Sequence, residues 1–103
     1  MIITIHQPDF LPWLGFFDRW RKSDLYIVLD DVQFIRRGWQ HRDKIKTQDG
    51  VQMLTVPVLK KGRYCQLIKE VEINNKENWR HKQLKTIQSA YKKAPNFDFV
   101  FSK

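Results

Sequence analysis

The chain has 103 residues, of which 42% are hydrophobic and 14% aromatic, so it can bury one small core and is not a disordered tail. It contains no run of the roughly 18 apolar residues that span a membrane, its start lacks the pattern of a signal peptide, and the single Cys65 can form no internal disulfide, so we expect a cytoplasmic protein. The net charge of +8 comes entirely from residues 41–103, which favours an anionic partner or a solvated lysine-rich face.

The first predicted elements are a strand over residues 2–5, a loop, and a helix over residues 13–22. The strand is β-branched or apolar throughout. Pro12 falls at about the first helical position, where its missing N–H costs nothing. The helix carries apolar side chains at positions i, i+3, i+4 and i+7, which are Trp13, Phe16, Phe17 and Trp20.

A second strand is predicted over residues 25–29, and its nearly continuous apolar character is typical of a strand buried on both faces. Strand, helix and strand in about 29 residues form a βαβ unit, in which the crossover is right-handed and the strands are parallel. Both carboxyl ends then lie at one edge of the sheet, where α/β proteins bind ligands. This arrangement places His6 and Gln7 near Asp30 and Asp31.

Four residues of the first loop and helix start are candidates for catalysis or substrate binding. His6 can act as a general acid or base, can hydrogen-bond a phosphate, or can be a structural residue at a strand end. Gln7 can orient a substrate through its amide. Asp9 binds substrate or simply favours the start of the helix. We also place Trp13 among the substrate-binding residues.

Asp30 and Asp31 form the second catalytic candidate. Two carboxylates at a strand end can hold Mg²⁺ with the phosphates of a nucleotide, or one of them can be a general base. The alternative is a pair of turn-forming residues. Adjacent strand residues point to opposite faces, so only one of the two needs to face the ligand. No third metal ligand follows from the spacing.

A basic and aromatic segment follows the second strand. Arginine binds phosphate or carboxylate through two parallel hydrogen bonds, and tryptophan stacks on a base or sugar. The same mixture fits single-stranded nucleic acid. However, the chain has no pattern of a known nucleic-acid module and no glycine-rich phosphate loop. The predicted substrate-binding residues here are Arg36, Arg37, Trp39, Arg42 and Lys44.

The second half completes a single α/β domain over residues 1–103. Asp49-Gly50 predicts a hairpin between residues 41–46 and 51–56. Residues 67–73 predict a further strand, which gives a mixed sheet. Asn74 and Glu77 have capping-box spacing and start a packed helix that runs to about Lys92.

Seven short blocks of the chain form a combined pattern. They are residues 6–18 (HQPDFLPWLGFFD), 29–34 (LDDVQF), 39–42 (WQHR), 45–47 (IKT), 54–58 (LTVPV), 79–82 (WRHK) and 93–95 (KAP). Together these blocks resemble the WbqC-like family of bacterial proteins. The resemblance implies a role in O-antigen, lipopolysaccharide or other surface-polysaccharide biosynthesis, with transfer of glycine, another small acyl group or a sugar. It assigns no catalytic residues.

Members of this family extend beyond the length of this chain, so we expect an amino-terminal part of a longer protein. The leading hypothesis is a transferase, or part of one, that acts on a nucleotide-sugar, acyl donor or other anionic metabolite. The alternatives are a nucleic-acid-binding module that uses the basic half, or a non-catalytic scaffold. Under the scaffold hypothesis, a second copy or a carboxyl-terminal half docks on the side chains of Phe97, Phe99 and Phe101.

Overall fold

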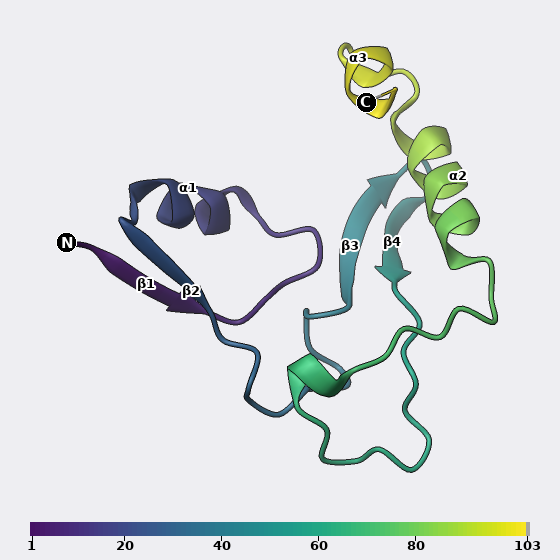
Figure 1. The fold of residues 1–103 in the computed structure, drawn as a ribbon. Helices are drawn as coiled ribbons and strands as arrows, with labels where there is room; N and C mark the ends of the chain where they lie inside the picture. Colours follow the sequence, from purple (N-terminus) through teal and green to yellow (C-terminus); the bar gives the residue numbers. More distant parts are fainter. Residues whose placement is uncertain (103) are drawn as a thin grey trace.

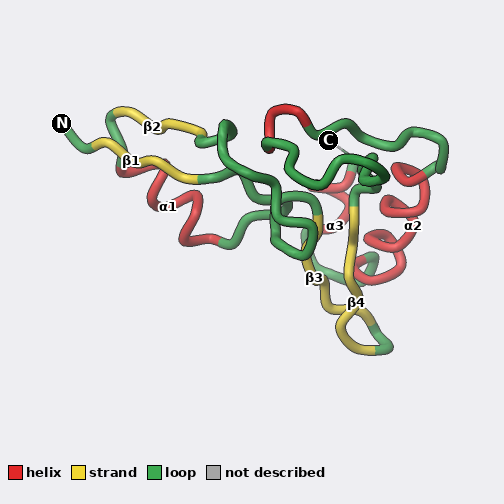
Figure 2. Tube along the Cα trace, turned by 90° about the horizontal axis from the view of Figure 1, so that it is seen from below, coloured by secondary structure: helices red, strands yellow, loops and turns green. Residues whose placement is uncertain are grey.

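The computed structural model describes residues 1–102 and has a mixed α/β architecture (Figure 1). Two groups of elements lie side by side, and long loops connect them (Figures 1 and 2). The first group is β1, α1 and β2, and the second is β3, β4 and α2. In chain order the elements are β1 (Ile3–His6), α1 (Leu14–Lys22), β2 (Leu25–Val28), β3 (Arg42–Thr47), β4 (Gly50–Thr55), the 3-10 helix η1 (Ile68–Glu70), α2 (Trp79–Tyr91) and α3 (Phe97–Phe101).

The βαβ start is confirmed. β1 and β2 pair in parallel, with Ile3 opposite Leu25 and His6 opposite Val28. The helix α1 covers the face of this sheet that carries Tyr26, because the rings of Phe16 and Trp20 lie 5.7 and 5.3 Å from the Tyr26 ring. The aromatic stripe predicted from the sequence therefore packs one face of the sheet.

The hairpin is also confirmed. β3 and β4 pair antiparallel from Arg42 opposite Thr55 to Thr47 opposite Gly50. Gly50 has φ of +112°, a backbone conformation that favours glycine. The helix α2 lies along the hairpin, where the side-chain amide of Gln83 donates to the Thr55 carbonyl at 2.9 Å.

The further strand predicted over residues 67–73 does not form. The Glu70 carboxylate accepts a hydrogen bond from the Leu67 N–H at 2.9 Å and closes η1 instead. Such local side-chain bonds compete with a strand ladder. Only isolated bridges remain in this segment, from Leu67 to Gln33 and from Ile73 to Val58. Among residues 1–102 the strands form two separate two-stranded sheets rather than one mixed sheet.

The helix predicted to start at Asn74 begins later, at Trp79. The Asn74 side-chain oxygen accepts from the N–H of Lys76 at 3.1 Å, which makes a local turn. The Asn75 side-chain oxygen accepts from the indole N–H of Trp79 at 3.1 Å. These two bonds keep residues 74–78 in a turn and hold the first residue of α2 against it.

The core of the described chain is small. Phe34 and Leu54 are its buried hydrophobic side chains, each 4% exposed. The radius of gyration is 16.0 Å, whereas a compact domain of this length has a radius of about 13 Å. The second face of the β1–β2 sheet is open and carries apolar side chains, contrary to the expectation that β2 is buried on both faces. This open face consists of Ile3, Ile5, Leu25 and Ile27.

Candidate functional site

A cavity of about 300 Å³ lies where β1 ends and the first loop begins. The loop brings His6, Gln7 and Asp9 together in the lining of this cavity. The rest of the lining is largely apolar and aromatic and comes from the loop prolines, from α1 and from β2. These lining residues are Pro8, Pro12, Phe16, Phe17, Trp20, Tyr26 and Val28.

The imidazole of His6 is held in a defined orientation. Its Nδ1 lies 2.6 Å from the Gln7 carbonyl oxygen, which can only accept, so Nδ1 carries the proton and donates. The lone pair of the neutral ring is then on Nε2. The Asp9 carboxylate lies 3.9 Å from Nδ1, and the Phe16 ring stands edge-on at 5.3 Å. His6 is therefore arranged to accept a proton through Nε2.

The sequence analysis missed Tyr26. Tyr26 lines the same cavity, and its hydroxyl is buried and has no hydrogen-bond partner. Burial raises the pKa of the Tyr26 phenol, Arg19 offsets part of the rise, and Asp9 adds to it. The phenol therefore stays protonated and can donate to a ligand. The alternation of the strand could have identified Tyr26. Val28 is paired with His6, and a residue two positions before Val28 lies on the same face of the sheet.

Two hydrogen bonds join the first loop to the chain before β3. The Gln40 side-chain nitrogen donates to Gln7 Oε1 at 2.9 Å, and the Phe10 N–H donates to the Trp39 carbonyl at 2.9 Å. Two positively charged side chains also lie close to the Trp39 ring. The Arg42 guanidinium and Lys44 ammonium lie 6.0 and 5.8 Å from its ring centre. A basic cluster of Trp39, Arg42 and Lys44 thus adjoins the loop that carries His6.

Arg36 lies apart from this cluster, whereas Arg37 is joined to it through its backbone carbonyl. The Arg36 guanidinium donates to the carbonyls of Lys60 and Arg63 at 2.9 and 3.4 Å and lies over the Tyr64 ring at 4.8 Å. Arg36 therefore holds the loop at residues 60–64. Arg37 is exposed, and its carbonyl accepts from Arg42 at 2.6 Å.

Asp30 and Asp31 follow β2 at the same sheet edge as His6, because the Leu29 N–H donates to the His6 carbonyl at 2.8 Å. Both carboxylates are exposed, and neither lines the His6 cavity. The Asp30 carbonyl accepts from the Lys69 N–H at 2.9 Å and ties this turn to η1. Trp13 is 69% exposed and lies outside the cavity.

Metal ligands are not clustered in the described part of the chain. Residues 1–102 contain no group of three His, Cys, Asp or Glu side chains placed to hold an ion. A Mg²⁺ ion at Asp30 or Asp31 would therefore take its remaining ligands from phosphate oxygens and water.

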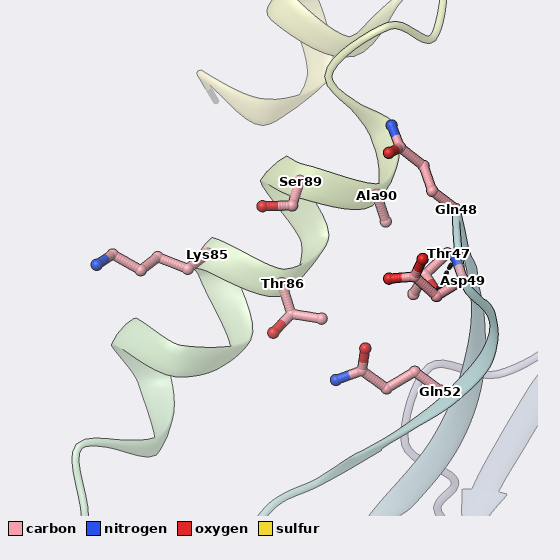
Figure 3. A pocket seen from close by; sticks show the side chains of 8 residues that line it. All are labelled: Thr47, Gln48, Asp49, Gln52, Lys85, Thr86, Ser89 and Ala90. Carbon is pink, nitrogen blue, oxygen red and sulfur yellow. Dashed lines mark hydrogen bonds between the residues drawn. The ribbon is translucent and has the colours of Figure 1, made fainter.

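A second, polar cavity of about 270 Å³ lies between the hairpin turn and α2 (Figure 3). Gln52 points toward the helix across the gap, and Lys85 points away from it. The Thr47 hydroxyl is occupied, because it donates to the Gly50 carbonyl and accepts from the Asp49 N–H. The exposed side chains here are Gln48, Asp49, Gln52, Lys85 and Ser89. Its lining lacks a histidine and a buried unpartnered polar atom, so the His6 cavity is the stronger candidate.

Comparisons with known proteins agree with the pattern at the His6 loop. A sequence model of the WbqC-like protein family matches residues 7–103. The uncharacterised protein Rv1507c of Mycobacterium tuberculosis is 37% identical over 95 residues, which cover 92% of this chain and 41% of the relative. The chain thus spans about two fifths of the length of this curated relative. No solved structure matches the chain.

Helices long and apolar enough to cross a membrane are absent from residues 1–102.

Proposed function

The chain belongs to the WbqC-like protein family, and from this premise we propose that it is a transferase, or part of one, in surface-polysaccharide assembly. Its substrate is an activated sugar or another anionic donor. The observation that carries the proposal is the His6 geometry. The hydrogen bond from Nδ1 to the Gln7 carbonyl leaves a basic Nε2 beside a largely apolar cavity.

In this proposal His6 is the general base. Nε2 takes the proton of an acceptor hydroxyl as its oxygen forms a bond to the transferred group. The bond between that group and the donor breaks, and the leaving group keeps the electron pair. The imidazolium that forms is stabilised by the Asp9 carboxylate, 3.9 Å from Nδ1. The Tyr26 hydroxyl is available to donate a hydrogen bond to the ligand.

The basic cluster takes the anionic part of the donor. Arg42 and Lys44 supply two positive charges beside Trp39, and the Phe10–Trp39 backbone bond keeps this cluster next to the loop. Cations next to a departing anion lower its energy in the transition state. Gln7 has its side-chain oxygen occupied by Gln40, which leaves its amide nitrogen as a donor for orienting the substrate.

We further propose that residues 1–103 act as the amino-terminal part of a larger folded unit in the cytoplasm. The open face of the β1–β2 sheet and the large radius of gyration support this. Parallel sheets are normally covered on both faces. The mycobacterial relative continues well beyond the matched region. The exposed free thiol of Cys65 fits a reducing compartment.

The test is a thermal-shift panel on the purified chain with nucleotide-sugars, acyl-coenzyme A, and ATP with and without Mg²⁺. A ligand at 100 times its Kd stabilises a protein by about 2.7 kcal/mol. We expect a nucleotide-sugar or acyl donor to raise the melting temperature of the wild-type chain. The shift should be lost in His6→Ala.

The matched control is His81→Ala, because His81 is exposed on α2, far from the cavity in sequence and absent from its lining. It should keep the full shift. A donor that stabilises His6→Ala and wild type equally would remove His6 from the site and with it the proposed mechanism.

A further inference from the structure

A third cavity, of about 270 Å³, lies behind the His6 loop and is lined mainly by apolar side chains. It is built from the chain before β3, the segment that follows β4, and η1 with the residues that follow it. Pro8 lines both this cavity and the His6 cavity. The apolar lining includes Phe34, Val56, Val58, Ile68 and Val71.

Two polar side chains that line this cavity are unusual. His41 is 5% exposed, and its Nδ1 has no hydrogen-bond partner. The buried side-chain oxygen of Gln40 also has none. Buried polar atoms are almost always hydrogen-bonded in folded proteins, because leaving one unpaired costs free energy. Two such atoms, on adjacent residues that both line one apolar cavity, therefore point to a ligand that pairs with them.

The charge of the surroundings narrows the choice of ligand. Burial lowers the pKa of His41, and the positive charges of Lys60 and Arg42 lower it further. The imidazole is therefore neutral at pH 7. An ammonium group would meet the same two cations and find no carboxylate in the lining. The same two cations would attract a carboxylate, but neither lines the cavity, so the carboxylate would lose its hydration among apolar side chains without a charged partner in the lining.

We propose that this cavity binds an uncharged, mainly apolar small molecule or substituent that carries one amide or hydroxyl group. A primary amide has two N–H groups and a carbonyl oxygen, so it pairs with the Gln40 oxygen and with His41 Nδ1 in either tautomer, whereas a hydroxyl pairs with both when Nδ1 carries the proton. The apolar remainder contacts the valine and isoleucine side chains. This inference does not rest on the proposed transferase activity, and the Gln7–Gln40 bond connects the two cavities.

The experiment titrates hexanamide into the isotope-labelled chain and follows the His41 ring and Gln40 side-chain NMR signals. Hexylammonium and hexanoate have the same alkyl length and serve as charged controls. We expect millimolar binding of hexanamide, which is typical of a ligand with so few atoms. Both side chains should shift, and the two charged probes should bind at least about tenfold more weakly.

Two variants locate the effect. Val58→Phe fills the cavity and should abolish the shifts. His41→Phe keeps an aromatic ring against Phe34, whose ring lies 4.9 Å away, and should weaken hexanamide binding by roughly tenfold through loss of the ring nitrogen. His81→Phe is the control and should bind as wild type. Absence of shifts in the wild-type chain would mean that the cavity does not take such a ligand, and equal binding of all three probes would mean that it does not select an uncharged group. Either result would overturn the proposal.

Discussion

The side-chain oxygen of Gln7 accepts a hydrogen bond from the side-chain nitrogen of Gln40 at 2.9 Å, across 33 positions of sequence. It connects the loop after β1 with the segment that enters β3. Gln40 is followed directly by the buried His41. This side-chain bond and the Phe10–Trp39 backbone bond therefore join the His6 cavity to the His41 cavity.

We predict that Gln7→Met destabilises the chain by about 1–2 kcal/mol, because it leaves the part-buried Gln40 amide without its one partner. Gln7→Met/Gln40→Met should recover part of this loss, because the unpaired amide is then removed as well. Urea unfolding measures both. Gln48→Met, exposed in the hairpin turn, should stay within about 0.5 kcal/mol of wild type. A double variant less stable than the sum of the single changes would contradict this explanation.

His41 should make stability depend on pH. Burial lowers its pKa below the ordinary value of 6.5 in the folded state, so the unfolded chain binds a proton there more readily. The free energy of unfolding therefore rises with pH between the folded-state and unfolded-state pKa values of His41. The stability that neutral His41 contributes is lost as the pH falls below about 6.5.

Thermal melts from pH 5 to 8 should show this loss in the wild-type chain as the pH falls below the ordinary histidine value. His41→Phe should flatten the pH dependence, whereas His81→Phe should leave it unchanged. An unaltered slope in His41→Phe would show that another group causes it.

The local pattern of the sequence predicted the elements whose hydrogen bonds are made nearby. The stripe from Phe16 to Trp20 and the Asp49-Gly50 turn each specify an element through a short period or a turn residue. Residues 67–73 show where this reasoning ends. Their alternation was that of a strand, but Glu70 bonds the Leu67 N–H, and no long neighbouring strand competes for it.

In the candidate site, too, some features could be predicted from the sequence and others could not. His6, Gln7 and Asp9 are adjacent in sequence, so their common cavity followed from the loop. The hydrogen-bond partners of Arg36 could not be predicted, because they are carbonyls 24 and 27 positions away in the sequence. The cavity at Gln40 and His41 could not be predicted from the sequence either, because tertiary packing alone decides which polar atoms are buried without partners.

Phe34 should be the side chain on which the small core depends most. It is 4% exposed and packs edge-on against His41. Phe34→Ala is expected to cost about 3–5 kcal/mol, which is enough to unfold most of a marginally stable chain. Ile35→Ala, at an exposed neighbouring position, should change stability by about 0.5 kcal/mol or less. Circular dichroism melts distinguish the two, and equal losses would show that Phe34 is not a core residue.

The open face of the β1–β2 sheet should tolerate polar substitution. Ile5 is 57% exposed, so Ile5→Thr and Leu25→Thr together should lower stability by about 1 kcal/mol or less. They should also reduce the fluorescence of a dye that binds apolar surfaces. Leu54→Thr, at a buried position, should cost several times more. If the open-face changes were as costly as Leu54→Thr, the isolated chain would already cover this face, for example by self-association.

The hypothesis of a nucleic-acid-binding module makes a prediction that distinguishes it from the transferase hypothesis. Binding to single-stranded DNA through the basic half should fall steeply with salt, with a slope of log K against log salt of about −0.7 for each phosphate contacted. Stacking of bases requires an open aromatic face, whereas Arg42 and Lys44 already lie against Trp39. We therefore expect weak binding that Trp39→Ala leaves unchanged, measured by fluorescence anisotropy at two salt concentrations. Tight binding that Trp39→Ala abolishes and His6→Ala preserves would favour the nucleic-acid module, because the base-stacking ring rather than the His6 cavity would then carry the interaction.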